Sequence, residues 1–514
     1  MKKIINLNNL KLVNLIVLIF IFSCSKDFLD RPLESGYSKD QFYETPDQLA
    51  VATNALYIAG WRGWVSDRFW VFSEIASGNA FTFDSRNRDF VTFSFNNRHE
   101  ALENSWGSLY GVIAQCNSVI IAIETQSGPS ISEIQLNNAL GEARTIRALA
   151  YFHLVRLFGD IPIYDNTELA ALNTEIRKNF ASDVYRFIKE DLNFAIDNIT
   201  HTKSSEPGRI TANAAKALLA KVSLHTQDYT DAYNLTNQVI SSGEFSLMNN
   251  YGDLFLTEND NNNESIIALQ WTNTGDYNEG NGTQSHFAYS QITGFGDGWS
   301  SLAPSIDLIQ SFERIGGNVI DRRFNETLMT PGTFYPNLNG GYTVSSDPSS
   351  YSRHNTGAGI KKYVIGRPEY NGGGAQQSYP NNTYMLRYAD VLLMHAESVL
   401  RGGGGSAIDA ENVLNMVRSR AGLGPITNPS LNDVFNERRH EFAFEGERWY
   451  DLLRMDDRLT KIANTERGFY ENNNFNELRS INTVLSEDQL LFPIPLNEIV
   501  ANPNLNLPPV AYYE

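Results

Sequence analysis

The stretch TANAAKALLAKVSLHTQDYTDAYNLTNQVISSGEF, residues 211–245, constrains the fold more than any other part of the sequence. Apolar residues recur in it at three-and-four spacing in two successive runs, which is typical of two amphipathic helices. Thr211 is a favourable N-cap for the first helix, and Gln227–Asp228 marks a short turn before the second. Small side chains allow the two helices to approach closely: Ala214, Ala215, Ala217 and Ala220. The stretch therefore predicts a helical hairpin.

A second stretch repeats this plan at residues 384–422, YMLRYADVLLMHAESVLRGGGGSAIDAENVLNMVRSRAG, with a glycine turn at 402–405. Alanine-rich helix pairs of roughly 34 residues resemble tetratricopeptide units, which bury their apolar faces only by stacking on one another. A longer helix is predicted within GEARTIRALAYFHLVRLFGDIPI, residues 141–163, where Gly159 and Pro162 end the apolar periodicity. The scaffold is therefore expected to be a stack of helical hairpins.

Two blocks between the helical stretches have a different composition. Residues 244–380 are rich in Gly, Asn, Ser, Thr and Tyr, with one strand-like run, ESIIALQWT, and one helical run at 304–313. Residues 60–98 are irregular and dense in aromatic side chains. Long loops in a compact protein usually carry function. The predicted fold class is mainly α: a tetratricopeptide-like helical-hairpin scaffold with an irregular, loop-rich subdomain that contains short helices and hairpins.

The N-terminus has the features of an export signal. Two lysines precede an almost entirely apolar run at residues 12–22, which is about half of the ~20 residues that a spanning helix needs. The run ends in IFSC, residues 21–24, which resembles a bacterial lipobox with an unusually bulky phenylalanine. Cys24 is therefore predicted to be lipidated, with more than one acyl chain to make the anchor durable. The alternative is an ordinary secreted protein that is cut nearby and loses Cys24.

Composition and motifs argue against several function classes. The net charge is −18 and no basic run is present, so nucleic-acid binding is not expected. Only Cys116 remains once Cys24 is lipidated, so no intrachain disulfide is expected, and Cys116 lies in an apolar helical stretch typical of a buried small side chain. His440–Glu441 lacks the second histidine of a zinc-binding HExxH motif, because Phe444 stands in its place.

Other signatures of catalysis and cofactor binding are also missing. The sequence has no GxSxG elbow, and the glycines at 402–405 are not followed by the lysine of a phosphate loop. Two cysteines cannot form a zinc cluster. The loop TENDNNNES, residues 257–265, offers oxygen ligands for calcium, but its spacing fits no EF-hand and a solvated loop is favoured. We expect no cofactor and no metal site.

Carboxylates and arginines are concentrated in ERRHEFAFEGERWYDLLR, residues 437–454. The acidic members are Glu437, Glu441, Glu445 and Asp451, and the basic neighbours include Arg438, Arg448 and Arg454. The favoured interpretation is ion pairing on the helix surface and between helices, rather than catalysis. A glycosidase would instead need two carboxylates facing each other across a cleft, about 5–10 Å apart.

Four long motifs occur in order along the chain. They are EARTIRALAYFHLVRLFGDIPI, LRYADVLLMHAES with NMVRSRAGL after it, ERRHEFAFEGERWYDLLR, and LFPIPLNEIVANPNLN. In sequence, order and spacing they resemble the signatures of the SusD/RagB family of outer-membrane nutrient-binding lipoproteins. The resemblance runs from CSKDFLDRP to the end of the chain. It departs from the family only at the last motif, which continues as NLNLPPVAYYE where members usually close in QNPGY or a similar sequence.

The resemblance implies a division of the chain. About four tetratricopeptide-like helix pairs would come from residues 40–60, 100–245 and 383–450. The expected regions are a lipoprotein signal peptide at 1–23, an N-terminal helical region at 24–245 with the aromatic loop 60–98, a loop-rich ligand-binding subdomain at 246–382, and a C-terminal helical region with its tail at 383–514.

The resemblance also implies a function and a location. Members of the family are anchored by lipid to the outer membrane, face the cell surface, and form a lid over a SusC-like TonB-dependent transporter. The SKD at residues 25–27 looks like the signals that send such lipoproteins to the surface in Bacteroidetes. Members capture oligosaccharides, polysaccharides or other nutrients, deliver them to the transporter, and are not enzymes. A peptide-binding RagB-like protein is the alternative, and a surface glycoside hydrolase is a less favoured one.

Two loop blocks have the composition of a sugar-binding site. Aromatic rings supply an apolar platform for the C–H faces of sugars, and Asp, Asn and Arg hydrogen-bond their hydroxyls. In the block at 60–90 the predicted ligand contacts are Trp64, Trp70, Asn79, Phe81, Asp84 and Arg86. In the block at 271–301 they are Tyr277, Tyr289, Asp297 and Trp299. Loop composition alone supports these choices. Core packing is the alternative for each ring, and it is favoured for Trp61, Trp70 and Trp271.

Overall fold

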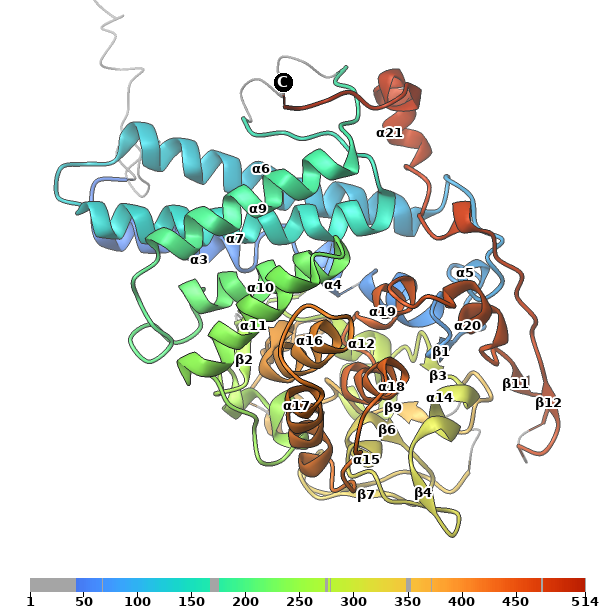
Figure 1. Cartoon of the computed structure of the whole chain (residues 1–514). Helices are drawn as coiled ribbons and strands as arrows, with labels where there is room; N and C mark the ends of the chain where they lie inside the picture. Colours follow the sequence, from blue (N-terminus) through green and yellow to red (C-terminus); the bar gives the residue numbers. More distant parts are fainter. Residues whose placement is uncertain are drawn as a thin grey trace, which may run out of the picture.

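The computed structural model describes residues 43–513, apart from residues 67, 167–174, 273–275, 278, 348–352, 371 and 473–474. Helices dominate the described residues and the strands are short (Figure 1). The predicted mainly α fold is therefore confirmed. The predicted signal peptide at residues 1–23 and the predicted lipidation site, Cys24, lie outside the described residues.

The scaffold consists of the long helices. They are α3 (Pro46–Leu56), α6 (Glu100–Gln126), α7 (Glu133–Phe158), α9 (Ala181–Asn198), α10 (Ala212–His225), α11 (Tyr229–Ser242), α16 (Tyr388–Leu400), α17 (Ala407–Arg420) and α18 (Leu431–Phe442). From α6 to α17 each of these helices packs against the next one along the chain. In Figure 1 the layer of α6, α7 and α9 lies at the top, and α10, α11, α16 and α17 continue the stack below it.

Both predicted hairpins are present. In the first, the side chain of Thr211 accepts the N–H of Ala214 and so caps α10, and the turn before α11 contains Gln227 in the left-handed region, with a φ of 60°. In the second, the glycine turn between α16 and α17 packs on the start of α11. A Cβ atom at Gly403 would lie 2.0 Å from the carbonyl oxygen of Tyr229, so only glycine fits there. The two hairpins therefore pack closely against each other at this turn.

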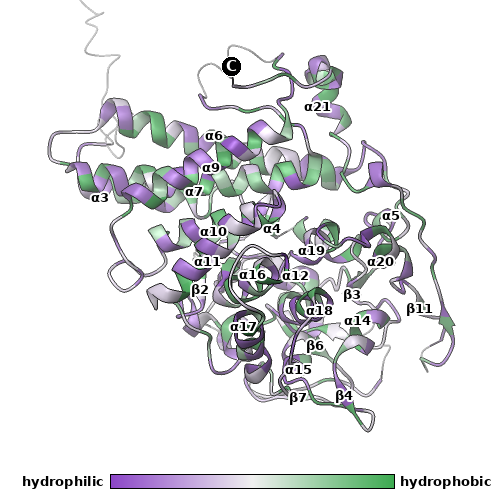
Figure 2. Cartoon of the chain, in the orientation of Figure 1, coloured by the Kyte–Doolittle hydropathy of each residue, from purple (hydrophilic) through white to green (hydrophobic). Residues whose placement is uncertain are grey.

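Helix α7 is the centre of the scaffold. Nearly all of its residues between 139 and 158 are buried, because α3, α6, α9 and α10 surround it. Helix α6 is long and apolar enough to cross a membrane, but half of its most apolar window is buried inside the fold, as in a core helix. Cys116 is buried in α6 as predicted, and burial raises the pKa of its thiol. Figure 2 shows hydrophobic and hydrophilic residues alternating along α6, α9 and α17, as expected of helices that bury one face.

Short elements make up the rest of the described chain. The helices are α4 (Arg62–Val65), η2 (Val71–Ile75), α5 (Asp89–Thr92), η3 (Gly252–Phe255), η4 (Thr257–Asn259), α12 (Thr283–Phe287), α13 (Ser290–Thr293), α14 (Ile306–Ser311), α15 (Arg323–Thr327), η6 (Pro368–Tyr370), α19 (Arg448–Leu453), α20 (Arg458–Asn464), η7 (Glu487–Gln489), α21 (Leu496–Ala501) and η8 (Pro503–Asn506). Between residues 246 and 382, no described helix or strand is longer than six residues. This is the irregular region that the composition predicted.

The described strands form two-stranded antiparallel pairs. They are β1 (Ala80–Phe81) with β3 (Ala303–Pro304), β2 (Ser265–Leu269) with β10 (Thr383–Arg387), β4 (Arg314–Ile315) with β5 (Asn318–Val319), β6 (Leu328–Met329) with β9 (Gly359–Ile360), β7 (Phe334–Tyr335) with β8 (Tyr342–Thr343), and β11 (Phe469–Tyr470) with β12 (Leu478–Arg479). The β2–β10 pair joins the start of the irregular region to the helix that follows it, α16. The β1–β3 pair joins two loop blocks that are distant in sequence.

The acidic and basic residues of the 437–454 motif are buried ion pairs. Glu441 on α18 contacts Arg387, Arg323 and Arg420, and its carboxylate is fully buried. On the neighbouring α19, Asp451 accepts from Arg438 at 2.9 Å. The predicted inter-helix pairing is confirmed. The predicted position on the helix surface is wrong, because these helices lie inside the fold, where charged groups are stable only when each has a partner.

Candidate functional site

Strand pairing brings together the two aromatic loop blocks of the sequence. In the β1–β3 pair, Ala80 lies opposite Pro304 and Phe81 opposite Ala303. Just beyond this pair, the hydroxyl of Thr82 donates to the carbonyl oxygen of Ser301 at 2.7 Å. The blocks at 60–98 and 271–301 therefore form one unit, although some 200 residues separate them in the sequence.

Several predicted site residues are buried beneath this unit. Trp64 stacks on Phe72 with ring centres 5.8 Å apart, and Phe81 stacks on Phe469 at 5.5 Å. Trp70 and Asn79 are fully buried as well. None of these four predicted residues has a surface to offer a ligand, so the prediction that they bind one is wrong. Trp64 and Trp70 lie in the core because α4 packs against α6 and η2 packs against α19.

Trp299 is the partly exposed ring at the centre of the unit. Its ring and the ring of His286 meet nearly perpendicular, with centres 4.9 Å apart, and His286 in turn contacts Trp70 at 5.0 Å. Trp70, although buried, thus supports Trp299 from below. A ring that is backed by packed rings keeps its orientation, which favours binding to a flat ligand.

The backbone around Trp299 is held at several points. The N–H of Trp299 donates to the carbonyl oxygen of Ser285 at 2.7 Å, and the N–H of Ser300 donates to that of Ala288 at 2.9 Å. The carbonyl oxygen of Trp299 accepts a guanidinium N–H of Arg353 at 2.8 Å. Because these hydrogen bonds fix the backbone before and after the Trp299 side chain, the ring has little freedom to move with its loop.

Asp297 joins the loops beneath Trp299. Its fully buried carboxylate accepts the hydroxyl of Ser285 at 2.8 Å, the N–H of Gln377 at 2.8 Å and the hydroxyl of Tyr379 at 3.1 Å. The side chain of Gln377 then donates to the hydroxyl of Tyr277, whose ring is 60% exposed. The prediction that Asp297 binds a ligand is wrong, because donors from the protein occupy it. It instead connects Tyr277 to the Trp299 loop.

Tyr289 is also a supporting residue. It is buried, and its backbone forms an antiparallel bridge with Trp299. Its ring fills the space next to Gly359, where a Cβ atom would lie 1.4 Å from the phenol oxygen. The predicted ligand contact through Tyr289 is therefore wrong, because this space is closed by the chain itself.

The predicted pair Asp84 and Arg86 lies at the outer edge of the unit. Two guanidinium nitrogens of Arg86 donate to the two carboxylate oxygens of Asp84, at 3.1 and 2.7 Å. This hydrogen bonding lowers the pKa of Asp84, and the charge of Arg353 lowers it further. The Arg86 side chain is 68% exposed and the Asp84 side chain 13%, so Arg86 presents the charged hydrogen-bonding groups to the solvent.

His354 connects the two loop blocks. Its Nδ1 accepts the N–H of Phe83 at 3.0 Å, so the other nitrogen, Nε2, donates to the carbonyl oxygen of Ser300 at 2.6 Å. This arrangement requires a neutral imidazole, and burial lowers the pKa of His354 to about 4. The ring of Phe83 is partly exposed and packs edge-on against Phe469, 4.6 Å away.

Sequence reasoning missed three residues of this unit: Phe83, Arg353 and His354. Phe83 could have been found, because it lies two residues after the predicted Phe81 in a short strand-like run, and residues two apart in a strand share a face. Arg353 and His354 belong to no motif, and their contacts to Trp299 and Phe83 span 54 and 271 residues. Of the predicted residues, the structure brings Tyr277, Trp299, Asp84 and Arg86 to the surface of the unit.

A side chain at Gly298 is expected to displace Trp299. A Cβ atom there would lie 2.2 Å from the carbonyl carbon of Tyr289, so the loop must shift. We expect Gly298→Ala to cost about 1–3 kcal/mol of unfolding free energy, measured by denaturant titration, and to change the near-ultraviolet circular dichroism of tryptophan. Gly424→Ala is the control, because nothing lies within 4 Å of its Cβ position. Equal stability of the two variants would contradict the close packing at Gly298.

Comparisons with known proteins identify the family. A family model described as "SusD family" matches residues 263–510, and one described as "Starch-binding associating with outer membrane" matches residues 27–224. A SusD-like protein of Bacteroides ovatus is 33% identical over 95% of this chain and 96% of its own length. The starch-binding protein SusD of Bacteroides thetaiotaomicron is 24% identical over 61% of this chain and 63% of its own.

Solved structures agree with this assignment. One that was crystallised with a xylogluco-oligosaccharide is 31% identical, with a TM-score of 0.77 over 91% of this chain and 99% of that one. A laminarin-binding SusD-like protein shares the fold at 24% identity, with a TM-score of 0.71 over 90% of this chain and 98% of that one. The resemblance that the four sequence motifs suggested is thus confirmed, and the chain belongs to the SusD family.

Proposed function

We propose that this protein captures an oligosaccharide or polysaccharide at the cell surface, on the surface formed by Trp299, Tyr277 and the Asp84–Arg86 pair. The observation that carries the proposal is the partly exposed ring of Trp299, held rigid by the loops on both sides of it. Sugars bind to such rings through their C–H faces. We call this surface the Trp299 surface.

The polar groups around the ring suit sugar hydroxyls. Arg86 offers charged donors that its pairing with Asp84 holds in place, and charge-assisted hydrogen bonds are stronger than neutral ones. Tyr277 adds an exposed ring with a phenol group, positioned through Gln377. A preformed site with one or two rings and few polar groups is the usual form of a small-ligand site.

The relative that was crystallised with a xylogluco-oligosaccharide supports a glycan as the ligand class. That protein shares nearly a third of its residues with this chain and matches it over almost its whole length. This likeness supports carbohydrate binding by this chain as well.

We propose binding without catalysis. A glycosidase needs a carboxylic acid whose pKa is raised so that it stays protonated near neutral pH. Asp84 is the acidic group at the edge of the Trp299 surface, and hydrogen bonds from Arg86 lower its pKa instead. Asp297, beneath the surface, is occupied by three donors of the protein.

We further propose that the protein is anchored to the outer membrane by lipid at Cys24 and passes its ligand to a SusC-like TonB-dependent transporter. The lipobox-like IFSC at residues 21–24 and the membership of the SusD family support this part of the proposal. The Trp299 surface would then hold the glycan while the protein closes over the transporter.

Affinity electrophoresis of the chain from Ser25 onward tests the proposal. The gels contain xyloglucan, laminarin, starch, mannan or pectin, and calorimetry with a peptide digest runs in parallel. We expect one glycan to retard the protein and no sugar to be released from it. Peptide binding without glycan retardation would favour the RagB-like alternative. Release of reducing ends would show a hydrolase and overturn the binding-only proposal.

A further inference from the structure

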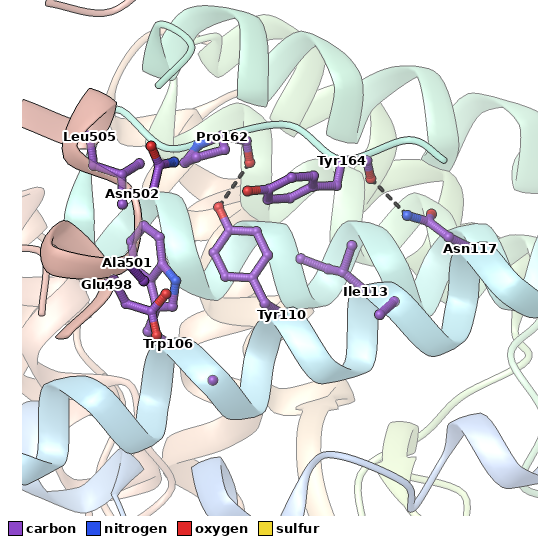
Figure 3. A pocket seen from close by; sticks show the side chains of 12 residues that line it. Trp106, Tyr110, Ile113, Asn117, Pro162, Tyr164, Glu498, Ala501, Asn502 and Leu505 are labelled. Atoms are coloured by element: carbon purple, nitrogen blue, oxygen red, sulfur yellow. Dashed lines mark hydrogen bonds between the residues drawn. The ribbon is translucent and has the colours of Figure 1, made fainter. Parts of the chain in front are cut away.

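A cavity lies in the helical scaffold, on elements other than those of the Trp299 surface. It has a volume of about 350 Å³ and opens between α6, the segment after α7, and α21 with η8 (Figure 3). It shares no residue with the Trp299 surface. In Figure 1, α6 and α21 lie at the top of the molecule, whereas β3 and α12 lie in its lower half. We call this cavity the α6 pocket.

Aromatic rings form its walls. Trp106 and Tyr110 come from one face of α6, one helical turn apart, with ring centres 4.9 Å apart. Tyr164 faces Tyr110 from the segment after α7, at 5.5 Å and nearly perpendicular. Ile113 continues the apolar floor along α6, as Figure 3 shows. The pocket can therefore bury an apolar body.

Most polar groups of the pocket are already used by the protein. The hydroxyl of Tyr110 donates to the carbonyl oxygen of Pro162 at 2.8 Å. The amide of Asn117 donates to the carbonyl oxygen of Tyr164 at 2.8 Å, and its oxygen accepts from Arg147. The amide of Asn502 likewise donates to the backbone outside the pocket, at 2.8 Å. These groups hold the pocket in shape and leave little hydrogen-bonding capacity for a ligand.

The carboxylate of Glu498 and the hydroxyl of Tyr164 are the exceptions. The Glu498 side chain is partly buried, and a carboxylate has about four acceptor positions. Burial raises the pKa of Glu498, and the neighbouring negative charge of Glu103 raises it further. Among the described residues that line the pocket, no Lys, Arg or His is present to offset this charge.

These features select a class of ligand. An anion would be repelled by Glu498 and by the electron-rich faces of the rings. A free sugar would bury several hydroxyls against groups that are already satisfied, which costs free energy. A cation on an apolar body suits both features, because aromatic faces attract cations and a carboxylate accepts their N–H groups.

We infer that the α6 pocket binds an ammonium or guanidinium group carried on an apolar stem, with the charged group at Glu498 and the stem among Trp106, Tyr110 and Tyr164. The volume of about 350 Å³ suits one such group, since ligand pockets begin at about 300 Å³. Two sources offer this chemistry: a free small molecule, or an arginine or lysine side chain of another protein. The inference does not depend on the glycan proposal.

Calorimetry with matched four-carbon compounds tests the ligand class. The compounds are butylammonium, butylguanidinium, neutral 1-butanol and anionic butyrate, all in phosphate buffer, because Tris is itself an ammonium compound. We expect one of the two cations to bind at least about tenfold more tightly than 1-butanol, and butyrate to show no binding. Glu498→Gln is expected to remove the advantage of the cation over 1-butanol. Equal binding of 1-butanol and both cations to the unmodified protein would overturn the inference.

Two glycines on α6 provide a matched pair of variants that assign the binding to this pocket. Nothing lies within 4 Å of a Cβ atom at Gly107 or at Gly111, and only Gly107 lines the pocket. Leucine favours a helix over glycine, so neither substitution should harm α6. We expect Gly107→Leu to fill the pocket and abolish cation binding, and Gly111→Leu to bind as the unmodified protein does. Cation binding that survives Gly107→Leu would also overturn the inference.

A third arm separates the two sources of the ligand. The capped peptide Gly-Gly-Arg-Gly-Gly is compared with butylguanidinium. If the peptide binds at least as tightly, the pocket admits a side chain of another protein; if only the free ion binds, its ligand is a small molecule. Either result supports the inference. Glycan retardation is measured on the same variants and is expected to stay unchanged, so that failure of one proposal is distinguishable from failure of the other.

Discussion

Glu441→Gln is expected to lower the free energy of unfolding by about 3–5 kcal/mol, the cost of breaking a buried ion pair by removing one partner. Glu441 lies between three guanidinium groups, those of Arg387, Arg323 and Arg420, and its side chain has no exposed surface. Glutamine keeps the size of the side chain and removes its charge. Three buried positive groups are then left with less negative charge around them. Denaturant titration followed by far-ultraviolet circular dichroism measures the loss.

The loss should depend on pH in a defined direction. Burial by itself would raise the pKa of Glu441, but the charges of Arg420, Arg387 and Arg323 outweigh it and hold the pKa well below the ordinary range. A carboxyl group whose pKa is lowered by folding stabilises the protein above its unfolded pKa of about 4.3. That contribution disappears as the pH falls through the folded value. The difference between Glu441→Gln and the unmodified protein should therefore shrink in acid.

Glu471→Gln is the control for this prediction. Glu471 pairs with Arg479 at 3.4 Å, and both side chains are at least half exposed. Exposed pairs of this kind are worth about 0–1 kcal/mol, so the control should leave the stability almost unchanged. A loss below about 1 kcal/mol for Glu441→Gln would mean that the charges around it are less buried than the structure places them.

Trp299→Ala is expected to weaken glycan binding at least about tenfold, or about 1.4 kcal/mol, with the glycan that retards the unmodified protein. The reason is that the substitution removes the ring at the centre of the Trp299 surface while leaving the supporting loops in place. Hot spots of this size are typical of central, well-supported tryptophans. Trp299→Phe should retain part of the affinity, because a smaller ring still offers a flat face. Affinity electrophoresis over a range of glycan concentrations gives the change.

Phe180→Ala is the matched control for Trp299→Ala. Phe180 is 44% exposed and precedes α9, a helix of the layer at the top of Figure 1, whereas α12 and β3 of the Trp299 unit lie in the lower half. The variant tests whether the loss of any exposed aromatic ring would weaken glycan binding. Thermal unfolding of both variants should match the unmodified protein, so that a loss of binding is a loss of contact. Unchanged retardation of Trp299→Ala would move the proposed site away from this surface.

The helical scaffold was predictable because its signals are local. The cap at Thr211, the turn at Gln227–Asp228 and the glycines at 402–405 act within one or two helical turns, and each is found where it was predicted. A helix also repeats its apolar positions every three to four residues, so its buried face can be read along the chain. The four motifs also indicated the SusD family, and the comparisons confirm this membership.

The site was predictable only in part. Loop composition directed attention to Tyr277 and Trp299, which both lie at the surface of the unit and stay candidates for ligand binding. The same composition gave equal weight to Trp64 and Phe81, which are buried. Nothing along the chain separates the two cases, because an aromatic ring in a loop suits a binding surface as well as a core. Only the packing of other segments against the loop decides which it becomes.

By itself the sequence determined the mainly α class, the hairpins, the family and the loop blocks from which a site could be built. The tertiary structure alone decided which rings stay exposed and which residues hold them. His354 joins Phe83 to Ser300 across 271 and 54 residues, and Asp297 joins Tyr379 and Gln377 to the Trp299 loop. Helix formation depends on neighbours in the chain, whereas burial and hydrogen bonding in a loop depend on neighbours in space. Those neighbours exist only once the whole chain has folded.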